Sequence, residues 1–126
     1  MIEFKNNLLY TKNNEWTEKI NDIVRVGIDD YSQKSLGDIV YVEICPVNTR
    51  LKAGDSFGSI EATKSVSEII SPVSGVVVKV NDAIKESPAI VNIDPFGDGW
   101  LIEIKPDDIS ELDNLMNVGE YKKFLS

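Results

Sequence analysis

Short runs of β-branched and aromatic residues, each closed by turn-forming residues, recur along most of this chain and limit what it can fold into. Within residues 23–28, for example, apolar side chains alternate with other side chains, which is the pattern of a half-buried strand. Many short strands separated by Gly, Pro, Asn and Asp are typical of an antiparallel sandwich or barrel. The sequence predicts strands at 23–28, 39–44, 56–61, 68–70, 75–80 and 100–104.

A few short helices are expected beside these strands. A brief helix is predicted at 29–36, with an aspartate at its start as the N-cap and Gly37 in the position that favours a left-handed residue. Near the end of the chain the apolar spacing becomes helical, which predicts a helix that Ser110 caps and that carries Leu112, Leu115 and Met116. After an interruption at Gly119, a final short helix is expected at 120–125. We expect these C-terminal helices to pack against the sheets.

Length and charge restrict the class of protein. A chain of 126 residues fits a single domain, here 1–126. Its 13 basic and 21 acidic residues give a net charge of −8, which argues against binding to nucleic acid or anionic lipid. No apolar run approaches the ~18 residues of a membrane span, and the N-terminus has no signal-peptide core. We therefore expect neither nucleic-acid nor membrane partners.

The chain contains no histidine and one cysteine, Cys45. The missing histidine excludes Ser-His-Asp and Cys-His catalysis and most zinc sites, so no metal site and no catalytic residue are predicted. A single cysteine forms no internal disulfide, which fits a reducing compartment. A non-catalytic role is favoured, and a freestanding enzyme that works with carboxylates is kept as an alternative.

Lys64 lies midway between two predicted strands and is flanked by small residues, so a hairpin turn would present its amine to solvent. Glu61 precedes it by three residues and Glu68 follows it by four; a Ser-Pro-x-x-Gly sequence that ends at Gly75 then opens a valine-rich strand. This pattern resembles the hairpin of lipoyl and biotinyl carriers. Biotinyl carriers usually have methionines beside the lysine, and none is present here, so lipoyl is preferred and biotin is kept as an alternative. Gly75 is expected to need backbone freedom.

Further sequence blocks narrow the resemblance. The blocks are Asn14-Glu15-Trp16, residues 26–33 (Val-Gly-Ile-Asp-Asp-Tyr-Ser-Gln), residues 36–43 (Leu-Gly-Asp-Ile-Val-Tyr-Val-Glu) and residues 91–101 (Val-Asn-Ile-Asp-Pro-Phe-Gly-Asp-Gly-Trp-Leu). Together, in this order, they resemble the glycine cleavage system H protein family over nearly the whole chain. The resemblance implies a mainly β barrel-sandwich hybrid: two small antiparallel sheets with short helices, including the C-terminal ones.

The resemblance also implies roles for particular residues. Lipoate is expected in amide linkage on Lys64, and Glu15 and Glu68 are expected to line the cleft where the lipoyl arm rests. Glu61 is expected to serve recognition by the lipoylating enzyme. The chain departs from the family motifs at Asn14, where the family has His, and at Ala62 and Thr63 beside the lysine.

As a carrier, the protein would move an aminomethyl group from a glycine decarboxylase to an aminomethyltransferase and then be reoxidised by a dihydrolipoyl dehydrogenase. A lipoate ligase or a lipoyl or octanoyl transferase would be a further partner. The alternative within the family is a lipoate relay carrier that donates lipoyl groups to 2-oxoacid dehydrogenase complexes. The protein is expected to be a monomer in the cytoplasm, or in the mitochondrial matrix for a mature eukaryotic chain.

Overall fold

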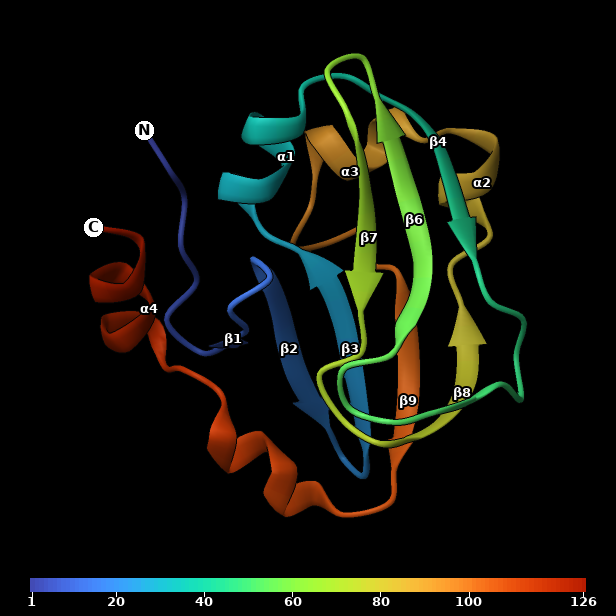
Figure 1. Cartoon of the computed structure of the whole chain (residues 1–126), viewed down its shortest axis with the longest axis vertical. Helices are drawn as coiled ribbons and strands as arrows, with labels where there is room; N and C mark the ends of the chain where they lie inside the picture. The colour runs from blue at the N-terminus through green and yellow to red at the C-terminus, as the bar shows by residue number, and fades with distance from the viewer.

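The computed structural model describes all residues from 1 to 126 and is mainly β (Figure 1). Its strands are β1 (Leu9–Tyr10), β2 (Glu15–Ile20), β3 (Ile23–Ile28), β4 (Ile39–Ile44), β5 (Arg50–Leu51), β6 (Ser56–Ala62), β7 (Val66–Ile70), β8 (Gly75–Val80) and β9 (Ile102–Pro106). The helices are α1 (Asp30–Leu36), α2 (Ala83–Glu86), α3 (Ala89–Ile93), the 3-10 helix η1 (Ile109–Asn114) and α4 (Val118–Leu125).

The strands form two antiparallel sheets. The larger sheet has the order β1-β2-β3-β9-β8-β5, and the smaller has the order β4-β6-β7. In Figure 1 the smaller sheet lies in front of the larger one, and both sheets remain open at their edges. The predicted barrel-sandwich fold of two antiparallel sheets with short helices is confirmed.

The main core contains twenty buried side chains contributed by both sheets. Strand β3 shows how the alternation builds it, because Val24, Val26 and Ile28 are all buried whereas Arg25 between them is only half-buried. Burial of each such side chain contributes about 1.5–3 kcal/mol. Because the smaller sheet is held by this core, the β6–β7 hairpin has a rigid base.

A second, smaller core lies on the other face of the larger sheet, where Leu8, Tyr10, Trp16 and Tyr121 pack together. Successive residues of a strand point to opposite faces, so β2 sends the Trp16 side chain into this cluster and the Glu15 side chain toward the main core. The Trp16 indole also donates a hydrogen bond to the Pro95 carbonyl (2.9 Å). The tryptophan therefore anchors the strand that carries Glu15.

The segment after β9 differs from the sequence prediction. Asp108, and not Ser110, is the N-cap: its carboxylate accepts the N–H of Ser110 (3.0 Å), and η1 is a 3-10 helix that ends before Leu115. Met116 is extended and exchanges two backbone hydrogen bonds with Tyr10 (2.8 and 2.9 Å). Because this bridge holds the backbone of Met116, the predicted helix through this residue is wrong.

Two element boundaries also move. α4 begins at Val118, because Asn117 and Glu120 form a reciprocal capping box (2.9 Å in each direction), so Gly119 lies inside the first turn and does not interrupt the helix. β9 begins at Ile102, after a turn that the N–H of Trp100 helps to close. None of the helices has both the length and the apolar character that crossing a bilayer requires.

Candidate functional site

The β6–β7 hairpin carries Lys64 at its tip. The two strands pair in register up to Glu61 and Val66, and the N–H of Ala62 donates to the carbonyl of Ser65 (2.9 Å), so three residues form the turn. The Lys64 side chain is exposed, and none of the ion pairs in the structure involves it. The amine is thus presented on a fixed backbone and is free to react.

The two glutamates near the lysine in sequence lie on the same hairpin. Glu61 and Glu68 are both exposed, and they project from the solvent-facing side of the smaller sheet, opposite the side that buries Ile60 and Ile69. Glu68 pairs with Ser59, two residues before Glu61 on the same strand. These carboxylates therefore give the surface beside the lysine a negative charge.

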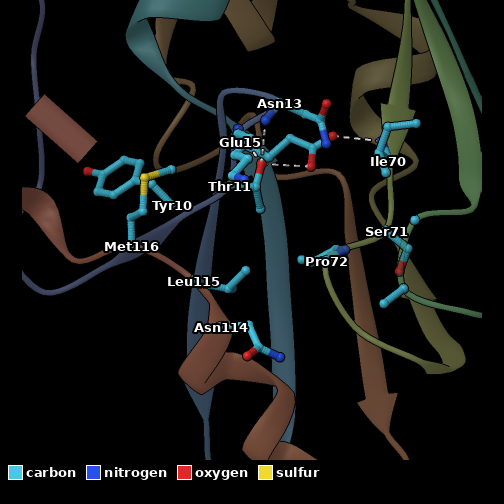
Figure 2. Close-up of a pocket in the computed structure, with 13 residues that line it drawn as sticks. Tyr10, Thr11, Asn13, Glu15, Ile70, Ser71, Pro72, Asn114, Leu115 and Met116 are labelled. Carbon is cyan, nitrogen blue, oxygen red and sulfur yellow. Dashed lines mark hydrogen bonds between the residues drawn. The ribbon is translucent and has the colours of Figure 1, made fainter. Parts of the chain in front are cut away.

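Glu15 lies in a cleft at the other end of β7 (Figure 2). The cleft is lined by residues 10–13 and Glu15 from the first hairpin, 53–54 from a turn, 70–72 at the end of β7 and 114–116 at the end of η1. Figure 2 shows the Glu15 carboxyl between Thr11 and Ile70, with Asn114 and Leu115 approaching from the C-terminal segment. Four separate segments thus meet around one carboxyl group.

The Glu15 carboxyl is held by two hydrogen bonds. Its Oε2 accepts the backbone N–H of Ile70 (2.7 Å), and its Oε1 accepts the hydroxyl of Thr11 (3.3 Å). The residue is only 1% exposed, and this burial raises the pKa of Glu15 to about 8, although both hydrogen bonds act in the opposite direction. At neutral pH the carboxyl therefore holds a proton, and a cation that entered the cleft would favour its ionised form.

The hairpin and the cleft are joined by β7. β7 begins at Val66, beside the turn that carries Lys64, so at a rise of about 3.3 Å per residue Glu68 lies roughly 7 Å and Ile70 roughly 13 Å along the strand from its first residue. The structure does not bring Glu68 into the cleft, whose lining includes Glu15 but neither Glu61 nor Glu68. Of the four candidate site residues, Lys64, Glu61 and Glu68 therefore lie on the hairpin itself. Only Glu15 lies in the cleft.

Sequence reasoning missed the partners of Glu15. The hydroxyl of Thr11 also accepts the N–H groups of Asn13 and Glu15 itself (3.1 and 3.3 Å), so it organises the loop between β1 and β2. The adjacent asparagines Asn13 and Asn14 are turn-forming residues and were a signal for this hairpin. No local signal pointed to the backbone of Ile70, because its contact with Glu15 depends on how the sheets pack.

Comparison with known proteins matches nearly the whole chain to a single protein family. Residues 8–126 match the sequence model of a family described as "Glycine cleavage H-protein". The chain is 43% identical to the glycine cleavage system H protein of Anaeromyxobacter sp. (strain K), over 98% of this chain and 97% of the relative. It is 47% identical to the protein of the same description from Coprothermobacter proteolyticus, over 94% of each chain.

A solved structure agrees with the sequence comparison. The fold is similar to that of a glycine cleavage system H protein from Mycobacterium marinum, with a TM-score of 0.86 and 36% sequence identity. The similarity covers 95% of this chain and 97% of that one. The hairpin and the cleft therefore belong to an architecture that is similar from end to end.

Proposed function

The chain belongs to the glycine cleavage H-protein family, and on this premise we propose that it is the lipoyl carrier of a glycine cleavage system, with lipoate attached to Lys64. The observation that carries the proposal is the presentation of Lys64, whose unpaired amine stands on the turn of a rigid hairpin. A modifying enzyme needs such an accessible and fixed amine. The alternatives of a lipoate relay carrier and a biotin carrier gain no support from the site.

Attachment requires only the Lys64 amine and an activated acyl group. The unprotonated Nζ of Lys64 would attack the carbonyl carbon of a lipoyl adenylate and form the C–N bond of the amide as the C–O bond to the phosphate breaks. Adenylate leaves with the electron pair, and the proton of the amine passes to solvent. The formal net charge of the protein then changes from −8 to −9, since an ammonium group becomes a neutral amide.

Once attached, lipoate supplies a dithiolane that can be reduced and can carry an aminomethyl group. The length of the lysine side chain and the lipoyl chain together, roughly twelve bonds, is about 14 Å when extended. An arm of this length is about as long as β7 from Val66 to Ile70, whose N–H binds Glu15. The distance along β7 thus fits the group.

Within this proposal the acidic residues have separate roles. Glu15 would receive the cationic aminomethyl group in the cleft and become ionised there, since a nearby positive charge lowers the pKa of a carboxyl group. Glu68, halfway along β7, would face the arm as it passes. Glu61, beside the turn, would be read by the lipoylating enzyme. In these roles none of the three residues would make or break a bond in the arm.

The partners follow from the same chemistry. We infer that a glycine decarboxylase loads the arm, an aminomethyltransferase unloads it, and a dihydrolipoyl dehydrogenase reoxidises it. A lipoate ligase or a lipoyl or octanoyl transferase would attach the cofactor. Tethering the reactive group to a mobile arm raises its effective concentration at each of these active sites.

The test of the proposal is the mass of the protein after incubation with a lipoate ligase, lipoate and ATP. Lys64→Arg keeps the charge, but its guanidinium remains protonated and accepts no acyl group, so the lipoyl adduct should be lost. Lys52→Arg, in another exposed turn, is the matched control and should gain the adduct as the wild type does. A lipoyl adduct on the Lys64→Arg protein would overturn the assignment, and a biotinyl adduct in the parallel reaction would favour the biotin carrier.

The role in glycine cleavage needs a second measurement. Lipoylated protein incubated with glycine and a glycine decarboxylase should gain the mass of an aminomethyl group. Transfer of lipoate from this protein to a 2-oxoacid dehydrogenase subunit, without aminomethyl loading, would favour the relay carrier instead.

A further inference from the structure

Asn92, in α3, makes side-chain hydrogen bonds to the connection between α1 and β4. Its Nδ2 donates to the carbonyl of Gly37 (2.9 Å) and to Oε1 of Gln33 (3.1 Å), and its Oδ1 accepts the N–H of Ile39 (2.9 Å). Gln33 lies in α1 and Ile39 opens β4, so a single amide spans the connection between them. The turn at 37–39 is therefore fixed from outside.

The same turn supports the tip of the lysine hairpin. The carbonyl of Asp38 accepts the N–H of Thr63, the residue before Lys64 (3.0 Å). Figure 1 shows the β6–β7 turn beside the connection from α1 to β4. The hairpin tip is thus bound to a neighbour at the point where it would otherwise extend freely into solvent.

Gly37 leaves room for the lysine side chain. A Cβ built on Gly37 would lie 3.2 Å from Oγ1 of Thr63 and 3.4 Å from Cε of Lys64, so the stem of the lysine rests against bare backbone. Gly37 has φ +82° and ψ −158°, a conformation that is essentially restricted to glycine. The turn is consequently a shelf, formed by residues 37–39, on which both the backbone before Lys64 and the Lys64 side chain rest.

We propose that Asn92 is a positioning residue for the modification of Lys64: it fixes the shelf at 37–39, and the shelf sets the direction in which the lysine amine meets the lipoylating enzyme. The proposal rests on Lys64 being the lipoylated residue. An enzyme that acylates one lysine among the many on this chain must recognise where the amine stands. A displacement of about 1 Å in a reacting group can cost about 100-fold in rate.

Asn92→Ala tests the proposal because it removes three hydrogen bonds, two of them to the shelf and one to Gln33 in α1. The control is Asn81→Ala, which removes an equivalent set: Nδ2 of Asn81 donates to the carbonyls of Asp98 and Trp100 (2.8 and 2.7 Å), and its Oδ1 accepts the N–H of Ala83 (3.3 Å). None of these bonds reaches the shelf or the hairpin. Comparing the two variants thus separates the effect of losing the hydrogen bonds of an asparagine in general from the effect of losing those that Asn92 makes to the shelf.

Two rates are measured at Lys64 for each protein, at a temperature where circular dichroism shows all of them folded. The first is enzymatic lipoylation by a lipoate ligase, and the second is acetylation by N-hydroxysuccinimidyl acetate, followed by mass spectrometry of the peptide that contains Lys64. The small reagent needs exposure of the amine but no fixed direction. For Asn92→Ala we expect at least a roughly tenfold lower kcat for lipoylation with an unchanged acetylation rate; Asn81→Ala should match the wild type in both.

Milder variants keep the test valid if the alanine proteins unfold. Asn92→Asp and Asn81→Asp each retain the oxygen that accepts a backbone N–H and lose the amide that donates, and only Asn92→Asp should slow lipoylation. Equal lipoylation of the Asn92 and Asn81 variants, or a parallel loss of lipoylation and acetylation, would overturn the positioning role. Failure of the wild-type protein to be lipoylated at Lys64 would instead overturn the proposed function.

Discussion

The hydroxyl of Tyr121, in the last helix, donates a hydrogen bond to Oδ2 of Asp29, the residue that caps the first helix. The Asn14 amide donates to the same hydroxyl (2.8 Å), and the Tyr121 ring stacks on Tyr10 with 4.4 Å between centroids. Burial raises the pKa of Asp29 to about 6 despite the hydrogen bonds from Tyr121 and from the N–H of Ser32. One buried phenol therefore joins α4, the first hairpin and α1.

Removing this hydroxyl should destabilise the protein although the aromatic packing survives. Tyr121→Phe leaves Asp29 without its side-chain donor and the Asn14 amide without its acceptor, and stranding a buried polar group costs about 1–3 kcal/mol. Urea unfolding should report that loss. Tyr31→Phe is the control, since Tyr31 is 37% exposed, and its effect should stay within about 0.5 kcal/mol. Equal midpoints for the two variants would contradict the structural role of the Tyr121 hydroxyl.

The proton on Glu15 should appear in the pH dependence of stability. The pKa of Glu15 is about 8 in the folded protein and 4.5 in a model carboxyl, so between these values the folded state holds a proton that the unfolded state has released. The free energy of unfolding should therefore fall as pH rises from about 4.5 to about 8, by an amount on the order of a few kcal/mol.

Glu15→Gln is the reference protein for this measurement. Glutamine keeps an oxygen for the N–H of Ile70 and does not titrate, so the variant should lose less stability than the wild type across the same range. Asp29 titrates in both proteins, and its contribution cancels in the difference between the two. Denaturant midpoints at several pH values give the comparison. Parallel pH profiles would mean that Glu15 is already ionised at neutral pH.

The same variant tests whether Glu15 holds the loaded arm. Lipoylated proteins are loaded with glycine and a decarboxylase, the enzyme is removed, and loss of the aminomethyl group is followed by mass. Removing a buried charge should exceed the roughly 0.2–1 kcal/mol of an exposed pair, so the adduct on Glu15→Gln should decay at least about five times faster. Glu68→Gln, at an exposed position outside the cleft, should change the rate less. Identical decay in wild type and Glu15→Gln would remove Glu15 from the site.

Gly75 illustrates a sequence prediction whose physical reason changes. The positive-φ glycines are Gly37 and Gly54, so the backbone of Gly75 needs no left-handed freedom. A Cβ at position 75 would instead lie 2.9 Å from the carbonyl carbon of Lys105 and 2.9 Å from Cγ2 of Ile104 on β9. Close approach of two strands, and not conformation, is what excludes a side chain here.

Gly75→Ala should accordingly lower the melting temperature, with a cost of about 1–3 kcal/mol from overpacking. Gly119→Ala is a control of opposite sign, because a Cβ there meets only the Asn117 side chain at 3.5 Å and alanine favours a helix by about 0.5–1 kcal/mol. A Gly75→Ala protein as stable as the wild type would show that β8 and β9 can separate without cost.

Local patterns in the sequence predicted the elements whose hydrogen bonds are themselves local. Helix α1 forms where expected because the Asp29 carboxylate accepts the N–H of Ser32 (2.8 Å) and Gly37 takes a positive φ at the other end. The alternation of apolar residues predicted β3, and the β-branched and aromatic run at 39–44 predicted β4. The position of Lys64 between two β-type runs predicted its place on a hairpin. The family blocks added the expectation that Glu15 faces a cleft.

The burial and the protonation of Glu15 in that cleft depend on contacts between residues far apart in the chain. Glu15 and Ile70 are 55 positions apart, and only packing of the two sheets brings the carboxyl to this N–H and removes it from water. Asn92 and Gly37 are likewise 55 positions apart, and only the fold places α3 behind the shelf under the lysine. The sequence by itself determined six of the nine strands, the first helix and the place of Lys64 between two strands, because each depends on near neighbours. The tertiary structure decided the proton on Glu15 and the support of the hairpin, because burial and close approach exist only after the chain has folded.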